Sequence, residues 1–145
     1  MPNEHFRKWY LSGLQALRSA SEQGAQAGKE LQAKADDADL KAAVARYGSL
    51  AAEHHAAIIG FLAEINQEPN SFKDRIMEGV SNGTIEMLRA AEDARIIDLA
   101  VLSGTGSGAD YYANAFGGQT ATAQALWLSG QAGQWKSMAT QWSAF

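Results

Sequence analysis

Several residue types are absent or scarce in this chain, and each shortage excludes a class of protein. There is no cysteine among the 145 residues, which excludes disulfides and thiolate metal sites. Proline occurs only at positions 2 and 69, so little interrupts a helix. No apolar run reaches the roughly 20 residues that cross a bilayer. No cluster of lysine and arginine marks a nucleic-acid-binding surface.

Charge is scarce in only one part of the chain. The net charge is −4, yet from Leu99 to Phe145 the only charged side chains are those of Asp110 and Lys136. Charged residues are depleted in buried helices and at the centre of subunit interfaces. The C-terminal third is therefore expected to be a buried helix pair or the interface of a homodimer. Because no apolar run follows the N-terminus, we expect a cytoplasmic protein without a signal peptide.

Helical periodicity dominates what is present. Apolar residues recur at three- and four-residue spacing in five segments, and no strand-like alternation occurs. Asn3 is a predicted N-cap, an aspartate among residues 36–39 is expected to cap the second helix, and Gly117-Gly118 is expected to end the fourth. The segments are predicted at 3–34, 39–66, 71–93, 94–116 and 119–145. They predict one all-α domain over residues 1–145, an antiparallel helical bundle.

Three glycines stand inside the fourth segment, at positions 104, 106 and 108. Each costs a helix about 1 kcal/mol relative to alanine. Close packing, a break in the helix or room for another molecule would offset that cost. A phosphate-binding loop is excluded, since no strand precedes the run and no Gly-Lys-Ser/Thr follows it.

Short matches in three helices resemble a known family. They are Tyr10-Leu-Ser-Gly-Leu-Gln15, Met77-Glu-Gly-Val80, and Asp98 followed by Tyr111 and then Phe116-Gly117. In these the chain resembles the ferritin-like proteins known for the bacterial stress proteins YciE and YciF. The resemblance implies a ferritin-like antiparallel four-helix bundle with a fifth, C-terminal helix, and it implies a carboxylate-rich metal centre.

The family's metal-binding positions are substituted in this chain. Its glutamates fall on Gly13 and Gly83, its Glu-His-Tyr-Glu motif becomes residues 109–112, and its last pair falls near Trp135. We therefore expect no metal and no cofactor. A residual metal centre assembled from Glu53, His54, Glu86 and Asp110 stays open as an alternative.

Removing four inward carboxylates leaves volume in the core. It has to be filled by tighter helix packing, by aromatic side chains, or by a bound molecule that is small and apolar or aromatic. In the third segment Phe72, Ile76, Val80, Gly83, Met87 and Ala90 are expected to face inward. The expected ligand-binding residues are Gly13, Gly83, Gly108, Tyr112 and Trp135.

Three residues are candidates for cofactor-independent acid/base chemistry of the lyase or isomerase type. His54 lies on the apolar stripe of the second segment, where it is either a general base or a hydrogen-bonded core histidine. Asp110 is either a partly buried acid with a raised pKa or the cap of a helix that restarts after a break. Tyr111 would place a phenol beside it. The competing hypothesis is a stress-associated structural or interaction protein that acts as a homodimer.

Overall fold

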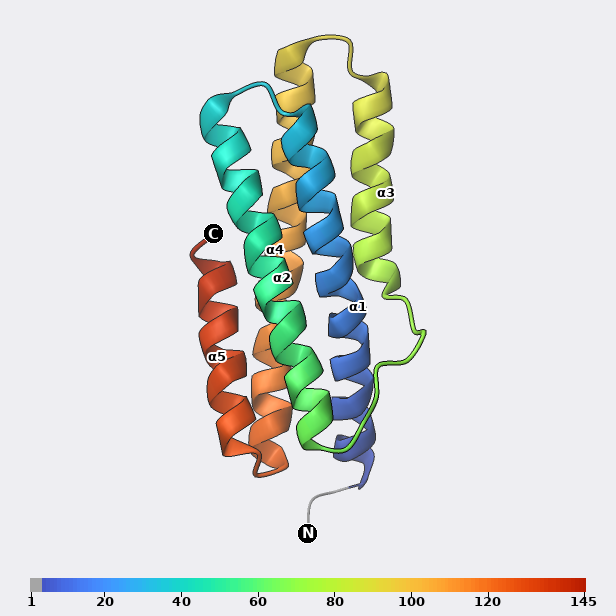
Figure 1. The fold of residues 1–145 in the computed structure, drawn as a ribbon, viewed down its shortest axis with the longest axis vertical. Helices are drawn as coiled ribbons and strands as arrows, with labels where there is room; N and C mark the ends of the chain where they lie inside the picture. Colours follow the sequence, from blue (N-terminus) through green and yellow to red (C-terminus); the bar gives the residue numbers. More distant parts are fainter. Residues whose placement is uncertain (1–3) are drawn as a thin grey trace.

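Five helices make up the part of the chain that the structure describes (Figure 1). The computed structural model describes residues 4–145, and no strand occurs in that range. The helices are α1 (Glu4–Lys34), α2 (Ala38–Glu64), α3 (Arg75–Ala90), α4 (Ala94–Ala125) and α5 (Ser129–Ser143). The predicted all-α bundle with a fifth, C-terminal helix is confirmed. The predicted N-cap Asn3 lies outside the described residues.

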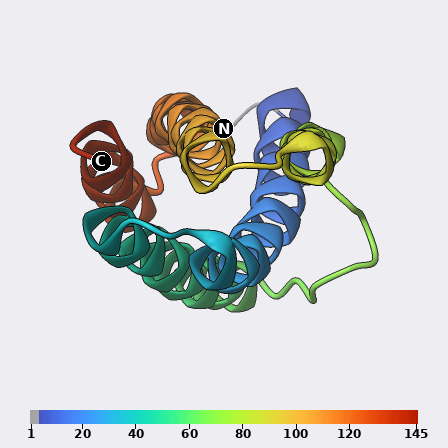
Figure 2. The ribbon, with the colours of Figure 1, turned by 90° about the horizontal axis from the view of Figure 1, so that it is seen from above.

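The bundle has two differently built ends. Helices α1 and α2 lie side by side and antiparallel, and α4 runs along the full length of this pair. Seen along the bundle, α3 flanks one side and α5 flanks the other (Figure 2). We call the end of the bundle that carries the turns at 35–37 and 91–93 the α3 end. The opposite end, which carries the turn at 126–128, is the α5 end.

Aspartates define where three of the helices begin. The carboxylates of Asp37, Asp74 and Asp93 accept hydrogen bonds from the first free amides of α2, α3 and α4. A short polar acceptor at the N-cap satisfies amides that have no partner within the helix. The predicted aspartate cap of α2 is therefore confirmed. Asp98 joins α4 to the turn between α1 and α2. Its carboxylate accepts hydrogen bonds from the backbone amides of Asp36 and Asp37 at 2.7 and 3.0 Å.

Helix α3 buries a different face from the one that the sequence predicts. It begins at Arg75, and Phe72, Ile76, Gly83 and Met87 are exposed. The buried residues are Met77 and Thr84, with Val80, Ser81 and Leu88 half-buried. Both sides of this helix carry apolar residues, so periodicity alone does not select one. On the side that packs inward, the Thr84 side chain occupies the space beside Gly104 in α4.

Helix α4 is continuous across both glycine groups. It has no break at 104–108 and does not stop at Gly117-Gly118, which lie exposed on its outer side. The helix continues because the next turn still buries Gln119, Thr122 and Ala123. It ends before Trp127, whose φ of 58° is a left-handed conformation. Neither α4 nor another helix in residues 4–145 is apolar enough over a sufficient length to cross a membrane.

The core differs between the two ends. At the α5 end it consists mainly of large side chains contributed by four helices, among them Tyr10, Phe61, Phe116, Trp135 and Trp142. At the α3 end a separate, smaller cluster contains Leu31, Ala35, Val44 and Val101. The α5 end therefore holds most of the bulky core residues.

Candidate functional site

His54 is a fully hydrogen-bonded core residue. The indole Nε1–H of Trp142 donates to Nδ1 at 2.8 Å, and Nε2 lies 2.9 Å from the amide oxygen of Gln141. Since an indole can only donate, Nδ1 is the acceptor and Nε2 carries the proton. Burial lowers the pKa of His54, against smaller opposing effects of the Gln141 bond and of Glu53. The imidazole is neutral, and both nitrogens serve to join α2 to α5.

A second buried network surrounds Trp135. Its indole donates to the hydroxyl of Tyr10 at 2.8 Å, and that hydroxyl donates to the amide oxygen of Gln131. The Gln131 amide in turn donates to Glu64 at 2.8 Å. Burial raises the pKa of Tyr10 to about 12, so the phenol stays protonated near neutral pH. Trp135 thus links α1 to α5 and has no polar atom free for a ligand.

The space beside the predicted glycines is filled by the protein itself. A Cβ at Gly13 would overlap the side-chain amide of Gln119, and a Cβ at Gly108 would overlap the hydroxyl of Tyr47. Gly24 accommodates the Tyr112 hydroxyl in the same way. The side chains of Gln119, Tyr47 and Tyr112 therefore occupy the space beside these glycines. Gly83 is exposed, with open space beyond it, so its predicted place in the core is wrong.

The three consecutive residues 110–112 point to different surroundings. Tyr112 is buried, stacks on Trp142 with ring centroids 4.5 Å apart, and donates to the carbonyl of Ala20. Tyr111 is half-buried and donates to the Asp74 carboxylate at 3.0 Å. Asp110 is exposed in the middle of an unbroken helix. It is therefore neither a buried acid nor a helix cap.

The candidate catalytic residues do not form one site. His54 bonds to α5, Tyr111 bonds to the start of α3, and Asp110 faces outward. Among residues 4–145 no three histidine or carboxylate side chains come close enough together to hold a metal ion. Glu53 and Glu86 are exposed, and Glu86 pairs with Arg89 at 2.7 Å.

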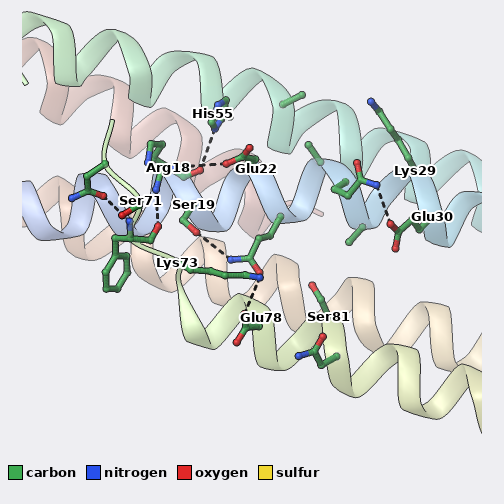
Figure 3. Close-up of a pocket in the computed structure, with 18 residues that line it drawn as sticks. Arg18, Ser19, Glu22, Lys29, Glu30, His55, Ser71, Lys73, Glu78 and Ser81 are labelled. Carbon is green, nitrogen blue, oxygen red and sulfur yellow. Dashed lines mark hydrogen bonds and ion pairs between the residues drawn. The ribbon is translucent and has the colours of Figure 1, made fainter. Parts of the chain in front are cut away.

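A polar groove that the sequence analysis missed lies between α1, α3 and the loop 65–74 (Figure 3). Its volume is about 910 Å³. Polar side chains of α1 hold the loop by its backbone. Arg18 donates to the carbonyl of Phe72 at 2.7 Å, and Ser19 accepts from the amide of Asp74 at 2.9 Å. A polar stripe at positions 15, 18, 19 and 23, beside the apolar stripe of α1, is the sequence signal for this loop.

The groove walls carry charges of both signs that already pair with one another. Lys73 meets Glu78 at 2.9 Å, and Arg18 meets Glu22 at 3.4 Å. His55 lies in the wall with Nδ1 3.1 Å from the carbonyl of Arg18. Because the wall charges are largely balanced, its electrostatics select no class of ligand.

A second cavity opens at the α5 end. It measures about 460 Å³, and mostly apolar side chains line it, among them Leu11, Ile65, Leu126 and Leu128. The predicted residues Gly13, Gly83, Gly108, Tyr112 and Trp135 do not line it. It is therefore distinct from the predicted interior site.

Comparison with known proteins relates the chain to a solved structure. No family model matches the sequence, and no curated protein matches it. The fold matches that of YcfI from Rhodopseudomonas palustris, provisionally described as a structural protein. The TM-score is 0.83 over 97% of this chain and 94% of YcfI, at 16% sequence identity. Identity this low shows a common fold alone. The likeness to YcfI supports the predicted YciF-like, ferritin-like arrangement of helices.

Proposed function

We propose that this protein is a structural or interaction protein that acts by self-association, and that it is a divergent, metal-free relative of the YciE/YciF proteins. Its interior supports this proposal. The space beside Gly13 and Gly108 is filled by Gln119 and Tyr47, and both nitrogens of His54 are engaged. His54 lines none of the cavities described above, and its two hydrogen bonds hold α2 against α5.

One observation on the outside of the molecule carries the proposal. Leu99 and Leu102, on the outer side of α4, are 63% and 57% exposed. Figure 2 shows no helix over the side of α4 that faces away from α1 and α2. From Leu99 onward this side includes Asp110 as its only charged residue. An exposed aliphatic surface with little charge is characteristic of protein contacts.

The structural neighbour is compatible with this proposal. YcfI has the same fold and is provisionally described as a structural protein. The exposed outer side of α4 is our reason for proposing a structural role for this chain as well. The occupant that we propose is a second copy of the same chain, since homodimers with two-fold symmetry are the commonest soluble oligomers.

Sedimentation velocity at a protein concentration well above the micromolar range tests the proposal. The wild-type protein is expected at twice the chain mass of 15.5 kDa. Leu102→Glu is expected at the mass of one chain, because two carboxylates would be buried in the contact. Trp9→Glu is the matched control, since Trp9 is also exposed but lies on α1, and it should remain dimeric. A monomeric wild-type protein at this concentration would overturn the proposal.

A further inference from the structure

We propose that two copies pair through the outer face of α4 in an antiparallel, two-fold arrangement, with Arg95 of each copy meeting Asp110 of the other. This inference rests on the proposed self-association and specifies its surface, direction and register. The two-fold axis passes between Leu102 and Ser103.

Between Arg95 and Asp110 the exposed residues of α4 are arranged symmetrically about this point. Six exposed residues of this stretch lie within about 100° of arc on the helix, and the same arc continues beyond the stretch with exposed Gly117, Ala121 and Gln124. The successive spacings of the six residues are four, three, one, three and four, the same in both directions. In an antiparallel pair each residue lies opposite the one equally far beyond the axis. The six residues are Arg95, Leu99, Leu102, Ser103, Gly106 and Asp110.

The two halves of this pattern are chemically complementary. About the axis, cationic Arg95 lies opposite anionic Asp110, large Leu99 lies opposite Gly106, and Leu102 lies opposite Ser103. Large side chains then pack against small ones, as close helix packing requires. A parallel pair would instead place Asp110 against Asp110 and Arg95 against Arg95, which like-charge repulsion disfavours.

Gly106, like Gly117 and Gly118 of the same helix, makes room for no neighbour within the chain. In the same run, Gly104 makes room for Thr84 and Gly108 makes room for Tyr47. A Cβ at Gly106 would meet nothing within 4 Å. A glycine inside a helix costs about 1 kcal/mol relative to alanine. In the proposed pair, the absence of a side chain at Gly106 leaves room for Leu99 of the second copy.

Both charged groups are accessible for the contact. The Arg95 side chain is 90% exposed and reaches only Asp93, at 3.3 Å. The Asp110 carboxylate makes no ion pair or hydrogen bond with residues 4–145. From Arg95 to Asp110 the helix rises about 22 Å, which limits the contact to a small interface. We therefore expect a dimer that dissociates in the micromolar range.

A charge-reversal experiment tests the pairing through the dimer dissociation constant. Arg95→Asp and Asp110→Arg each place like charges at both ends of the contact, and each is expected to weaken dimerisation about tenfold or more. Mixing the two single variants should restore the affinity, since each heterodimer then has two opposite-charge pairs. An effect within one chain cannot be restored by mixing. Two single variants that dimerise like the wild type would overturn the register.

Cysteine cross-linking tests the direction independently, because the chain has no cysteine of its own. Ser103→Cys lies beside the axis and should form a disulfide-linked or bis-maleimide-linked dimer. Ala121→Cys is the matched control on the same side of α4. In the antiparallel pair its two copies lie about 55 Å apart and should not cross-link. Cross-linking of both variants would indicate a parallel pair and overturn the inference.

The remaining outcomes separate this inference from the proposed function. If the wild type dimerises but Ser103→Cys does not cross-link, self-association stands and the α4 register is wrong. The Asp110→Arg variant can also be mixed with Lys136→Asp. If this mixture regains the wild-type dimer affinity and the mixture with Arg95→Asp does not, the partner of Asp110 lies on α5 and the register is also wrong. A monomeric wild type would overturn both.

Discussion

The two ends of this bundle satisfy the same requirement, a buried apolar interior, in different ways. At the α5 end, four helices enclose large rings such as Phe61, Phe116 and Trp135, and neighbouring ring centroids lie 5.0–5.3 Å apart. At the α3 end the separate core cluster is small and aliphatic. Large aliphatic side chains there remain exposed, including Ile76, Met87, Leu99 and Leu102.

This difference indicates which part of the molecule is complete by itself. Aromatic residues bury large areas and account for much of a domain's stability. The α5 end has these residues, and its polar atoms pair with one another. The α3 end is short of bulk inside and exposes aliphatic residues outside. Burying such residues against a second copy would remove about 1.5–3 kcal/mol of unfavourable exposure per side chain at most. Self-association through α4 would therefore cover aliphatic residues of the α3 end, whereas Trp9 and Trp127, 69% and 71% exposed, lie at the α5 end.

The largest expected effect is truncation of the aromatic core. Trp135→Ala removes a fully buried ring that contacts Phe61 and Phe116 and leaves a cavity. We expect the free energy of unfolding to fall by about 3–5 kcal/mol, measured by urea denaturation. Leu102→Ala, measured in dilute solution where dimers dissociate, should change it by about 0.5 kcal/mol or less. If both variants lowered the free energy of unfolding equally, the large core residues would not be concentrated at the α5 end in the way that the structure indicates.

The next effect concerns how the α3 end holds together with little side-chain bulk. There α1 and α2 approach backbone to backbone, and a Cβ at Gly28 would lie 2.6 Å from the Cα of Gly48. Gly28→Ala must push the helices apart, which we expect to cost about 1–3 kcal/mol.

Gly60→Ala is the matched control for this substitution. Gly60 is likewise in the interior of a helix, α2, but a Cβ there would meet nothing within 4 Å. We expect it to stabilise the protein by about 0.5–1 kcal/mol, because alanine favours a helix. Thermal denaturation of both variants provides the measurement. A tolerated Gly28→Ala would show that the α1–α2 contact is looser than the structure indicates.

Periodicity and turn residues predicted most of the fold. The positions of α1 and α2 follow from long apolar stripes and an aspartate cap. The orientation of α3 could not be predicted in the same way, because both of its sides are apolar. Its inward face is decided by Thr84 fitting against Gly104, a contact between residues 20 positions apart. The predicted end of α4 at Gly117-Gly118 was wrong. Burial of the next helical turn stabilises the helix by more than the two glycines destabilise it.

The candidate site was predicted less well, for a related reason. The sequence shows glycines inside the helices but not which side chains fill the space beside them. Gln119 and Tyr47 fill it from other helices, and no local pattern indicates this. His54 was correctly placed on the apolar stripe of α2, but its two partners on α5 lie 87 and 88 residues away. Only the structure distinguishes a paired histidine from a general base.

The smallest expected effect is a pH dependence of stability that belongs to His54 at the α5 end. In the folded protein burial lowers the pKa of this histidine, whereas in the unfolded chain it is about 6.5. Above the unfolded pKa both states are neutral there, and His54 contributes no pH dependence. As the pH falls through that value, the unfolded chain binds a proton that the native state resists. The free energy of unfolding should therefore fall by up to about 1.4 kcal/mol per pH unit, until the folded pKa is reached.

His54→Phe isolates this contribution. The substitution keeps a ring against Phe116 and Trp142 but cannot titrate. It leaves the Trp142 indole without an acceptor, which we expect to lower stability by about 1–3 kcal/mol at every pH. Urea denaturation of both proteins at pH 7.5 and 5.5 separates the two effects, because the carboxylates titrate alike in each. If the difference in stability between wild type and variant shrinks at the lower pH, the histidine is neutral in the folded protein. If it stays constant, protonation costs the native state nothing, and His54 cannot be held by the donor and acceptor pattern that joins α2 to α5.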